Sequence, residues 1–185
     1  MEHFPERSAQ AQAYAEFLKG PGIERGLIGP READRIWERH ILNCIPVSTL
    51  MKAGASVLDI GSGAGLPGVV IALARPDLKI TLLEPLQRRV QFLEEFNQSL
   101  PDLGIIVKRG KAEREKGSYD YVTARAVAPM AKLWEISKHL IKPGGSLLAM
   151  KGESAAAEAA EVPGAILHEI SLDGLPLARV VEVKR

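Results

Sequence analysis

A run of alternating glycines after a short apolar segment carries the clearest chemical signal in this sequence. The run is Val57-Leu58-Asp59-Ile60-Gly61-Ser62-Gly63-Ala64-Gly65-Leu66-Pro67-Gly68. Residues 57–60 favour a strand and the residues after Gly68 favour a helix, so the glycines are expected to form the tight turn between them. Glycine lacks a Cβ and adopts positive φ easily, which lets the backbone approach a ligand closely. The pattern predicts a cofactor-binding turn.

The spacing of the glycines and a later carboxylate narrow the class of cofactor. Leu66 stands where the dinucleotide-binding pattern has its third glycine, and the shorter loop suits a nucleoside better than a pyrophosphate. Glu84 lies about 20 residues beyond the turn, where a carboxylate can accept hydrogen bonds from both ribose hydroxyls. A surface glutamate that caps the next helix is the alternative. The turn and Glu84 together favour S-adenosylmethionine, bound at Gly61, Gly63, Gly65 and Glu84.

Other polar residues are predicted at the carboxyl ends of strands, where parallel sheets bind ligands. Asp59 can accept the amino group of the cofactor's methionine, directly or through water, or it can hold the glycine turn. Arg125 follows the fourth predicted strand, beside cofactor and substrate, and an ion pair with Glu113 or Asp59 is its alternative role. His40 is the best proton-transfer candidate among four histidines, although partly buried structural histidines are commoner.

Signatures of other chemistries are absent from the sequence. It has no Gly-x-Ser-x-Gly, no phosphate-binding loop ending in Lys-Ser/Thr and no His-Glu-x-x-His. The Asn/Asp-Pro-Pro-Tyr/Phe tetrapeptide, which holds exocyclic amines in amino-methylating enzymes, is also missing. Cys44 is the only cysteine, so we expect no disulfide, no cysteine metal cluster and no metal cofactor.

The apolar periodicity predicts elements that position these residues. Residues 8–19 form a helix with Ser8 as N-cap, ended by residues 20–22, and a second helix runs from Pro30 until Pro46 breaks it. Residues 143–145 are a turn before the fifth strand. The expected strands are 56–60, 79–83, 104–108, 119–124, 146–150, 166–172 and 177–183, and the expected core helices are 68–75, 86–100, 130–140 and 154–161.

Alternating strands and helices indicate a parallel sheet covered by helices on both faces. The last two strands are expected to add an antiparallel hairpin at one edge. We therefore predict an α/β, Rossmann-like fold with seven mostly parallel strands. The chain is expected to be a single domain over residues 1–185, with an N-terminal helical cap (1–50) and a cofactor-binding core (51–185).

Composition and charge exclude some classes of protein. Of the 185 residues, 46% are hydrophobic and 25% charged, and no apolar run reaches the roughly 20 residues of a membrane span. The N-terminus lacks the order of a signal peptide, so we expect a cytoplasmic protein away from membranes. The net charge is only +1, but basic residues gather at 25–40 and 108–116. Such clusters suit a nucleic-acid surface or a solvated face equally well.

Several motifs together resemble the RsmG (GidB) family, whose members methylate N7 of a guanine in the decoding region of 16S ribosomal RNA. The resemblance covers residues from about 10 to the end. It implies a class I S-adenosylmethionine-dependent methyltransferase fold, with cofactor contacts at Gly61, Leu66, Ala112, Glu113 and Arg125. The segment 113–119 is shorter than in many relatives, which affects how this loop covers the adenine. The motifs are 39–43 (RHILN), 59–68, 83–85 (LEP), 88–93 (RRVQFL), 112–113, 125–126 and 151–152.

The acceptor implied by this resemblance predicts the mechanism. Guanine N7 carries a free lone pair, so in-line methyl transfer needs no general base and positioning supplies most of the rate. Arginine suits the acceptor because it can pair with O6 or with phosphates. We expect Arg125, His40 and Lys151 to act in catalysis, and Arg39, His40, Lys111 and Lys151 to face the RNA. The expected partner is 16S rRNA or the small ribosomal subunit, bound by a monomer.

Three alternatives remain open from the sequence. Another class I methyltransferase, acting on a different RNA, a small molecule or a protein, would need a substrate-binding insertion for which the chain has little length. A nicotinamide-dependent oxidoreductase is disfavoured by Leu66 and by the missing second nucleotide-binding half. A non-catalytic ribosome-associated protein is disfavoured by the intact glycines and Glu84.

Overall fold

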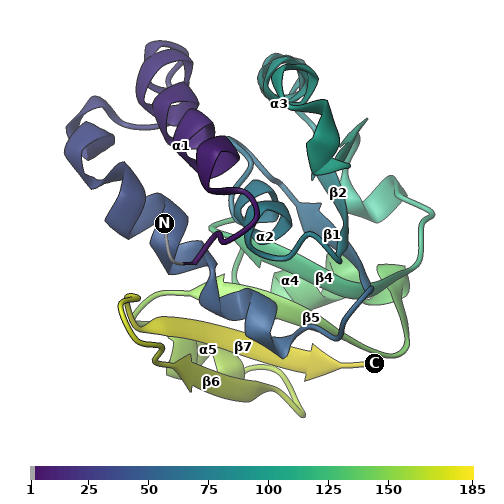
Figure 1. Cartoon of the computed structure of the whole chain (residues 1–185). Helices are drawn as coiled ribbons and strands as arrows, with labels where there is room; N and C mark the ends of the chain where they lie inside the picture. Colours follow the sequence, from purple (N-terminus) through teal and green to yellow (C-terminus); the bar gives the residue numbers. More distant parts are fainter. Residues whose placement is uncertain (1–2) are drawn as a thin grey trace.

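A twisted seven-stranded sheet forms the centre of the computed structural model, which describes residues 3–185 (Figure 1). The strand order is β3-β2-β1-β4-β5-β7-β6, with β1 to β5 parallel and β7 antiparallel to both β5 and β6. The predicted fold class is confirmed, and residues 1 and 2 of the predicted cap lie outside the described residues. The strands are β1 (Ser56–Ile60), β2 (Lys79–Glu84), β3 (Ile106–Arg109), β4 (Tyr119–Arg125), β5 (Ile141–Lys151), β6 (Ile166–Ile170) and β7 (Ala178–Lys184).

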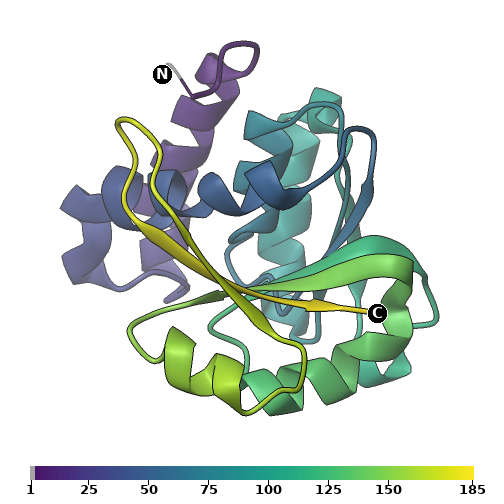
Figure 2. The same cartoon turned by 90° about the horizontal axis from the view of Figure 1, so that it is seen from below.

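Helices cover both faces of the sheet (Figure 2). Successive strand residues point to opposite faces, so Val57 packs in one apolar cluster and Leu58 in the other. The first cluster also takes up the N-terminal segment and residues of α1, α2 and α3, and the second takes up residues of α4 and α5. The helices are α1 (Ser8–Phe17), α2 (Gly68–Ala74), α3 (Gln87–Ser99), α4 (Met130–Ser137) and α5 (Ala155–Ala160).

Aromatic contacts hold α1 against α3 and so attach the N-terminal segment to the core. The Phe17 and Phe92 ring centroids are 4.6 Å apart, and those of Tyr14 and Phe96 are 4.9 Å apart. Such tilted aromatic pairs stabilise packing beyond the area they bury. Val90, Leu93 and Phe96 of α3 are buried, at the spacing of one helix face.

The start and end of the first helix differ from the predictions. Ser8 is the first helical residue and not the N-cap; Arg7 takes that position and its guanidinium donates to the Ala72 carbonyl at 2.7 Å. The helix also does not end at residue 20. It continues as a π-helical turn, η1 (Leu18–Gly22), whose wider hydrogen-bonding pattern accommodates Pro21 without an i−4 partner.

Two other predictions that depended on proline are wrong, a single helix broken at Pro46 and a turn at residues 143–145, although helical structure does begin at Pro30 as predicted. The second predicted helix is a series of short 3₁₀ and π turns, η2 (Pro30–Arg35), η3 (Ile36–Ile41), η4 (Leu42–Cys44) and η5 (Pro46–Leu50). Pro46 begins η5, a position where its missing N–H costs nothing. Residues 143–145 lie inside β5, at a point where its register with β4 shifts. Tyr119 pairs with Ile141 and Tyr121 pairs with Ser146, so the residues of β5 between these two pairs are an irregularity in the strand.

The remaining short turns are η6 (Pro101–Leu103), η7 (Ala112–Arg114) and η8 (Lys138–Leu140). Within residues 3–185, no helix combines the length and apolar character needed to cross a membrane.

Candidate active site

The glycine turn joins β1 to α2 at the carboxyl ends of the parallel strands. Gly61, Gly63 and Gly65 all have positive φ, at +66°, +58° and +101°. A Cβ on Gly65 would lie 2.5 Å from Val69 Cγ2 and 3.0 Å from the Tyr14 hydroxyl, so no side chain fits there. The same hydroxyl donates to the Ala64 carbonyl at 2.9 Å. The Tyr14 hydroxyl therefore anchors the predicted turn to α1.

Glu84 ties the glycine turn to the start of α3. It ends β2, is 1% exposed, and one carboxylate oxygen accepts the Gly63 N–H at 2.9 Å. The other oxygen accepts the Leu86 N–H at 3.0 Å, just before the first residue of α3. The surface position considered as the alternative from the sequence is wrong, because the side chain is buried. A carboxylate offers about four acceptor positions, so both oxygens keep capacity for ribose hydroxyls.

Asp59 lies fully buried beneath the same turn. One of its oxygens, Oδ2, accepts the Gly68 N–H at 2.9 Å, and a Cβ on Gly68 would come within 2.7 Å of that oxygen. The other oxygen, Oδ1, has no hydrogen-bond partner among residues 3–185. Burial raises the pKa of Asp59 to about 7, and the nearby Glu84 charge adds to this shift. Asp59 therefore holds the turn and retains one acceptor atom.

Arg125 connects the end of β4 to the N-terminal segment. Its Nη1 lies 3.3 Å from the Cys44 sulfur, and its Nη2 donates to the Arg39 carbonyl at 3.2 Å. The ion pair with Glu113 or Asp59 that the sequence allowed is not formed within the described part of the chain. All hydrogen-bond partners of this guanidinium are thus neutral groups of the cap.

The third partner of Arg125 is His40, whose two ring nitrogens are both engaged. Nδ1 lies 3.3 Å from Arg125 Nη2, and Nε2 lies 3.1 Å from Glu32 Oε2. A guanidinium can only donate, so this geometry assigns the proton to Nε2, which donates to Glu32. Burial and the Arg125 charge lower the pKa of His40. His40 is therefore a neutral bridge between Arg125 and Glu32.

Lys151 is held inside an ion pair at the end of β5. Its Nζ lies 2.7 Å from Glu158 Oε2 and donates to the Ala128 carbonyl at 2.7 Å. The hydrogen bond from Lys151 lowers the pKa of Glu158, which also accepts the Met130 N–H at 2.9 Å. Lys151 thus fixes the segment between β4 and α4.

Two cavities meet at Val127, in the segment after β4. The larger, called the Arg125 cavity, is about 640 Å³ and is lined by Arg39, Asn43, residues 125–129, residues 150–152, Glu158, Leu177 and Arg179. The smaller, called the Gly61 cavity, is about 220 Å³ and is lined by Ile60, Gly61, Leu83, Pro85, residues 110–113, Val127 and Ile136. A Cβ on Gly61 would lie 2.8 Å from Val127 Cγ2, so the two residues are in close contact.

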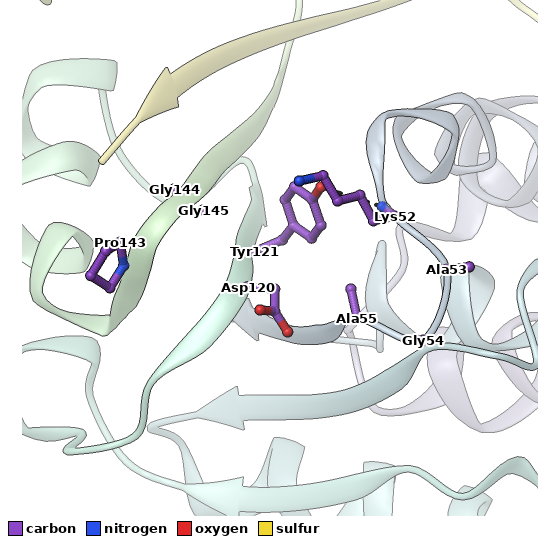
Figure 3. Close-up of a pocket in the computed structure, with 9 residues that line it drawn as sticks. All are labelled: Lys52, Ala53, Gly54, Ala55, Asp120, Tyr121, Pro143, Gly144 and Gly145. Carbon is purple, nitrogen blue, oxygen red and sulfur yellow. Dashed lines mark hydrogen bonds between the residues drawn. The ribbon is translucent and has the colours of Figure 1, made fainter.

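A third cavity, of about 310 Å³, lies at the opposite ends of the strands (Figure 3). Lys52, Asp120 and Tyr121 contribute to its wall, and the polar groups of Asp120 and Tyr121 already have hydrogen-bond partners. Asp120 accepts hydrogen bonds from the Ser56 hydroxyl at 2.6 Å and from Lys142 at 3.0 Å, and the Tyr121 hydroxyl accepts the Lys52 N–H at 3.3 Å. None of the predicted site residues lies in this cavity.

The structure brings most of the predicted site residues to one edge of the sheet. Arg39, Arg125 and Lys151 line the Arg125 cavity, whereas Gly61, Lys111, Ala112 and Glu113 line the Gly61 cavity. Asp59, Gly63, Gly65, Leu66 and Glu84 form the turn or support it without lining either cavity.

Sequence reasoning did not find Glu32, Cys44 and Glu158 as partners of the site. Each acts by contacting a predicted residue from a separate element, and no spacing in the sequence signals such contacts. Within residues 3–185, no three His, Cys, Asp or Glu side chains are grouped as metal ligands.

Comparison with known proteins identifies close relatives over nearly the whole chain. The GidB family, described as rRNA small subunit methyltransferase G, matches residues 7–173. The ribosomal RNA small subunit methyltransferase G of Thermobifida fusca is 51% identical over 184 residues, covering 98% of this chain and 76% of that protein. The protein of the same name from Mycolicibacterium gilvum is 54% identical over 158 residues, covering 82% and 68%.

Solved structures with much lower sequence identity share the fold. A methyltransferase from Pyrococcus furiosus aligns with a TM-score of 0.60 and 16% identity, covering 93% of this chain and 96% of that one. A precorrin-6y C5,15-methyltransferase from Geobacter metallireducens aligns with a TM-score of 0.59 and 12% identity, covering 87% and 92%. At such identities the likeness shows the fold alone.

Proposed function

The chain belongs to the GidB family of ribosomal RNA small subunit methyltransferases, and from this membership we propose that it methylates N7 of a guanine in 16S rRNA. S-adenosylmethionine is the methyl donor. The observation that carries the proposal is the meeting of two cavities at Val127, one beside the glycine turn and one beside Arg125. Methyl transfer requires donor and acceptor to approach in line, and adjoining cavities provide this arrangement.

The Gly61 cavity fits the adenosine part of the donor. Ile60, Leu83 and Val127 provide apolar walls for a flat ring, and the backbone of residues 110–113 provides polar groups at its edge. We place the ribose hydroxyls toward Glu84, with Leu66, Ala112 and Glu113 as further contacts. The methionine end then lies at Gly61, Gly63 and Gly65, and its ammonium group can reach the buried Oδ1 of Asp59, which has no hydrogen-bond partner within residues 3–185, directly or through a water.

The Arg125 cavity fits the acceptor base. Arg125 has no carboxylate partner within residues 3–185, so its guanidinium can donate to O6 of a guanine without breaking an ion pair there. The nearby ionisable groups that could remove a proton are already bound: His40 through both nitrogens and Glu158 to Lys151. This arrangement agrees with an acceptor atom that needs no general base.

The predicted catalytic and RNA-facing residues take different roles within this proposal. Arg125 contacts the acceptor, His40 positions Arg125, and Lys151 positions the 125–129 segment through Glu158 and Ala128. Arg39 and Lys111 are exposed and suited to contact RNA phosphates, although Arg39 also forms an ion pair with Glu32 at 2.9 Å. Lys151 reaches RNA only from the wall of the cavity, because its side chain is 10% exposed.

We also propose that the protein acts as a monomer in the cytoplasm, with the cap (1–50) and core (51–185) working as one domain. The contacts of Tyr14 with the glycine turn and of Arg125 with residues 39–44 support this unity, since each joins the cap to the site. Size-exclusion chromatography with light scattering measures the monomer directly. A dimer at micromolar concentration would contradict that part of the proposal.

The decisive experiment is labelled methyl transfer from S-adenosylmethionine to small ribosomal subunits from a strain that lacks the activity. We expect one methyl group per subunit, located at guanine N7 by nuclease digestion and mass spectrometry. Subunits from the parental strain are the control and should accept no label. Label on protein, on an exocyclic amine or on no component would contradict the proposal. Calorimetric titration with NAD should show no binding, which separates this activity from an oxidoreductase.

A further inference from the structure

A fourth cavity, at the same edge of the sheet as the Gly61 cavity and the Arg125 cavity, has a basic rim. This basic cavity, about 380 Å³, is lined by Pro85, Arg109, Gly110, Lys111, Arg114 and Glu115. It shares Pro85, Gly110 and Lys111 with the Gly61 cavity. Because β3 and β2 precede β1 and β4 in the sheet, the order along the edge is basic cavity, Gly61 cavity and Arg125 cavity.

The cations of this rim are not neutralised by the protein. Arg109, Lys111 and Arg114 are exposed, and within residues 3–185 no carboxylate lies within 4.0 Å of their charged groups. Glu115, the acid in the lining, already accepts hydrogen bonds from Lys108 at 3.1 Å and from the Gly117 N–H at 2.9 Å. Residues 108–116 hold five bases and two acids, so the local charge is positive.

The methyl donor does not account for this charge. In the proposed placement its adenine ring faces the basic cavity, and adenine is neutral at neutral pH. The charged groups of the donor belong to its methionine end, which lies at the glycine turn on the other side of the Gly61 cavity. The rim therefore suits a second, anionic ligand. The guanidinium group of arginine can donate two parallel hydrogen bonds to a phosphate, so a phosphate is a suitable anion.

We propose that Arg109 and Arg114 bind backbone phosphates of the RNA substrate, so that the RNA spans from the basic cavity to the Arg125 cavity. This inference rests on the proposed function and assigns a path to its substrate. RNA that contacts both outer cavities crosses the Gly61 cavity between them and covers the donor. The donor then binds before the RNA, and the spent donor leaves only after the RNA dissociates.

The test compares two double variants that remove the same charge. Arg109→Gln with Arg114→Gln alters the rim, and Lys52→Gln with Lys79→Gln is the matched control, since both lysines are exposed at the amino ends of the strands. We measure binding of unmethylated small subunits against salt concentration. The rim variant should bind about 10-fold more weakly, with a slope of log K against log salt reduced by about 1.5, because each phosphate contact contributes about 0.7–0.9. The control should match the wild type.

A second measurement follows release of labelled S-adenosylhomocysteine, the spent donor, which has no methyl group to transfer, from the wild type and from both variants. Bound RNA should slow release at least 5-fold in the wild type and the control, and much less in the rim variant. Equal salt slopes and equal release rates in the two double variants would overturn the RNA path and leave the rim as solvated surface. Binding is measured without turnover, so a wild type that binds RNA but transfers no methyl group would contradict the proposed function instead.

Discussion

Arg125 Nη2 lies 3.3 Å from His40 Nδ1, and this contact joins the end of β4 to the helical cap. The contact continues through His40 Nε2 to Glu32 at 3.1 Å, so the cap supplies a fixed hydrogen-bond acceptor to the arginine of the site. A histidine in this position is a positioning residue, because both nitrogens are occupied and its pKa is lowered by burial and by Arg125. The predicted role of His40 in proton transfer can therefore be tested against a role in orientation.

Replacing His40 distinguishes these two roles. His40→Ala should lower the single-turnover methylation rate at least 10-fold, because Arg125 loses its acceptor, while the affinity for S-adenosylmethionine stays unchanged. His40→Asn should restore most of the rate, since the Asn oxygen can take the place of Nδ1. A general base would behave differently, because the Asn variant would then be as slow as the Ala variant.

The reactivity of the Cys44 thiol measures whether the cap is closed over Arg125. The thiol is fully buried, and burial raises its pKa to about 11 although Arg125 lies 3.3 Å away. We expect no reaction with a thiol reagent at pH 8 in the native protein and full reaction in urea, because the thiolate is the reactive form. Arg125→Ala should open this region and speed the native reaction, and Arg179→Ala, in the same cavity, is the control. Rapid labelling of the native wild type would contradict the closed cap.

The sequence predicted the strand ends well because alternating elements constrain a parallel sheet strongly. Once β1, β2 and β4 lie side by side, Gly61, Glu84 and Arg125 must reach one edge, whatever the details of the helices. The cap was less predictable, since Pro21 and Pro46 are accommodated in π and 3₁₀ turns that depend on tertiary packing. The Glu32–His40–Arg125–Cys44 chain could not be predicted, because it exists only when the cap closes on β4.

Two glycine-to-alanine replacements test the fit of the turn under α1. Gly65→Ala should destabilise the protein by about 3 kcal/mol, because φ of +101° is unfavourable for alanine and the Cβ would displace Val69 and the Tyr14 hydroxyl. Gly20→Ala is the matched control, since a Cβ there would meet no neighbouring atom within 4 Å and alanine favours a helix by about 0.5–1 kcal/mol. Urea unfolding measures both, and equal midpoints would contradict the tight packing.

Glu84 allows a substitution that keeps the size of the side chain. In Glu84→Gln one oxygen becomes an NH₂ group, which cannot accept the N–H of Gly63 or of Leu86. We expect a loss of about 2 kcal/mol in unfolding free energy and at least 10-fold weaker binding of S-adenosylmethionine. Arg89→Gln, at 3.9 Å from the carboxylate, should change both quantities little. Unaltered donor affinity in Glu84→Gln would contradict the ribose contact.

The raised pKa of Asp59 predicts how the unfolding free energy and the affinity for the donor change with pH. Its pKa is about 7 when folded, above the ordinary value of 3.8, so the folded state binds the proton more tightly. This contribution to stability is complete below pH 3.8 and is lost as pH rises through 7. Asp59→Asn should remove that dependence. Asp77→Asn should leave it in place: the folded pKa of Asp77 is lowered from 3.8 to about 2, so its contribution to stability is constant above pH 3.8 and is lost only as pH falls through 2.

Donor binding should show the opposite trend if the unpartnered oxygen of Asp59 receives the ammonium group. A nearby positive charge favours the carboxylate, so binding releases a proton near pH 7 and tightens as pH rises from 6 to 8. Calorimetry in buffers of different ionisation enthalpy measures the released proton directly. Asp59→Asn should release none and bind with a flat pH profile, while Asp77→Asn should match the wild type. Equal proton release in wild type and Asp59→Asn would place the ammonium group elsewhere.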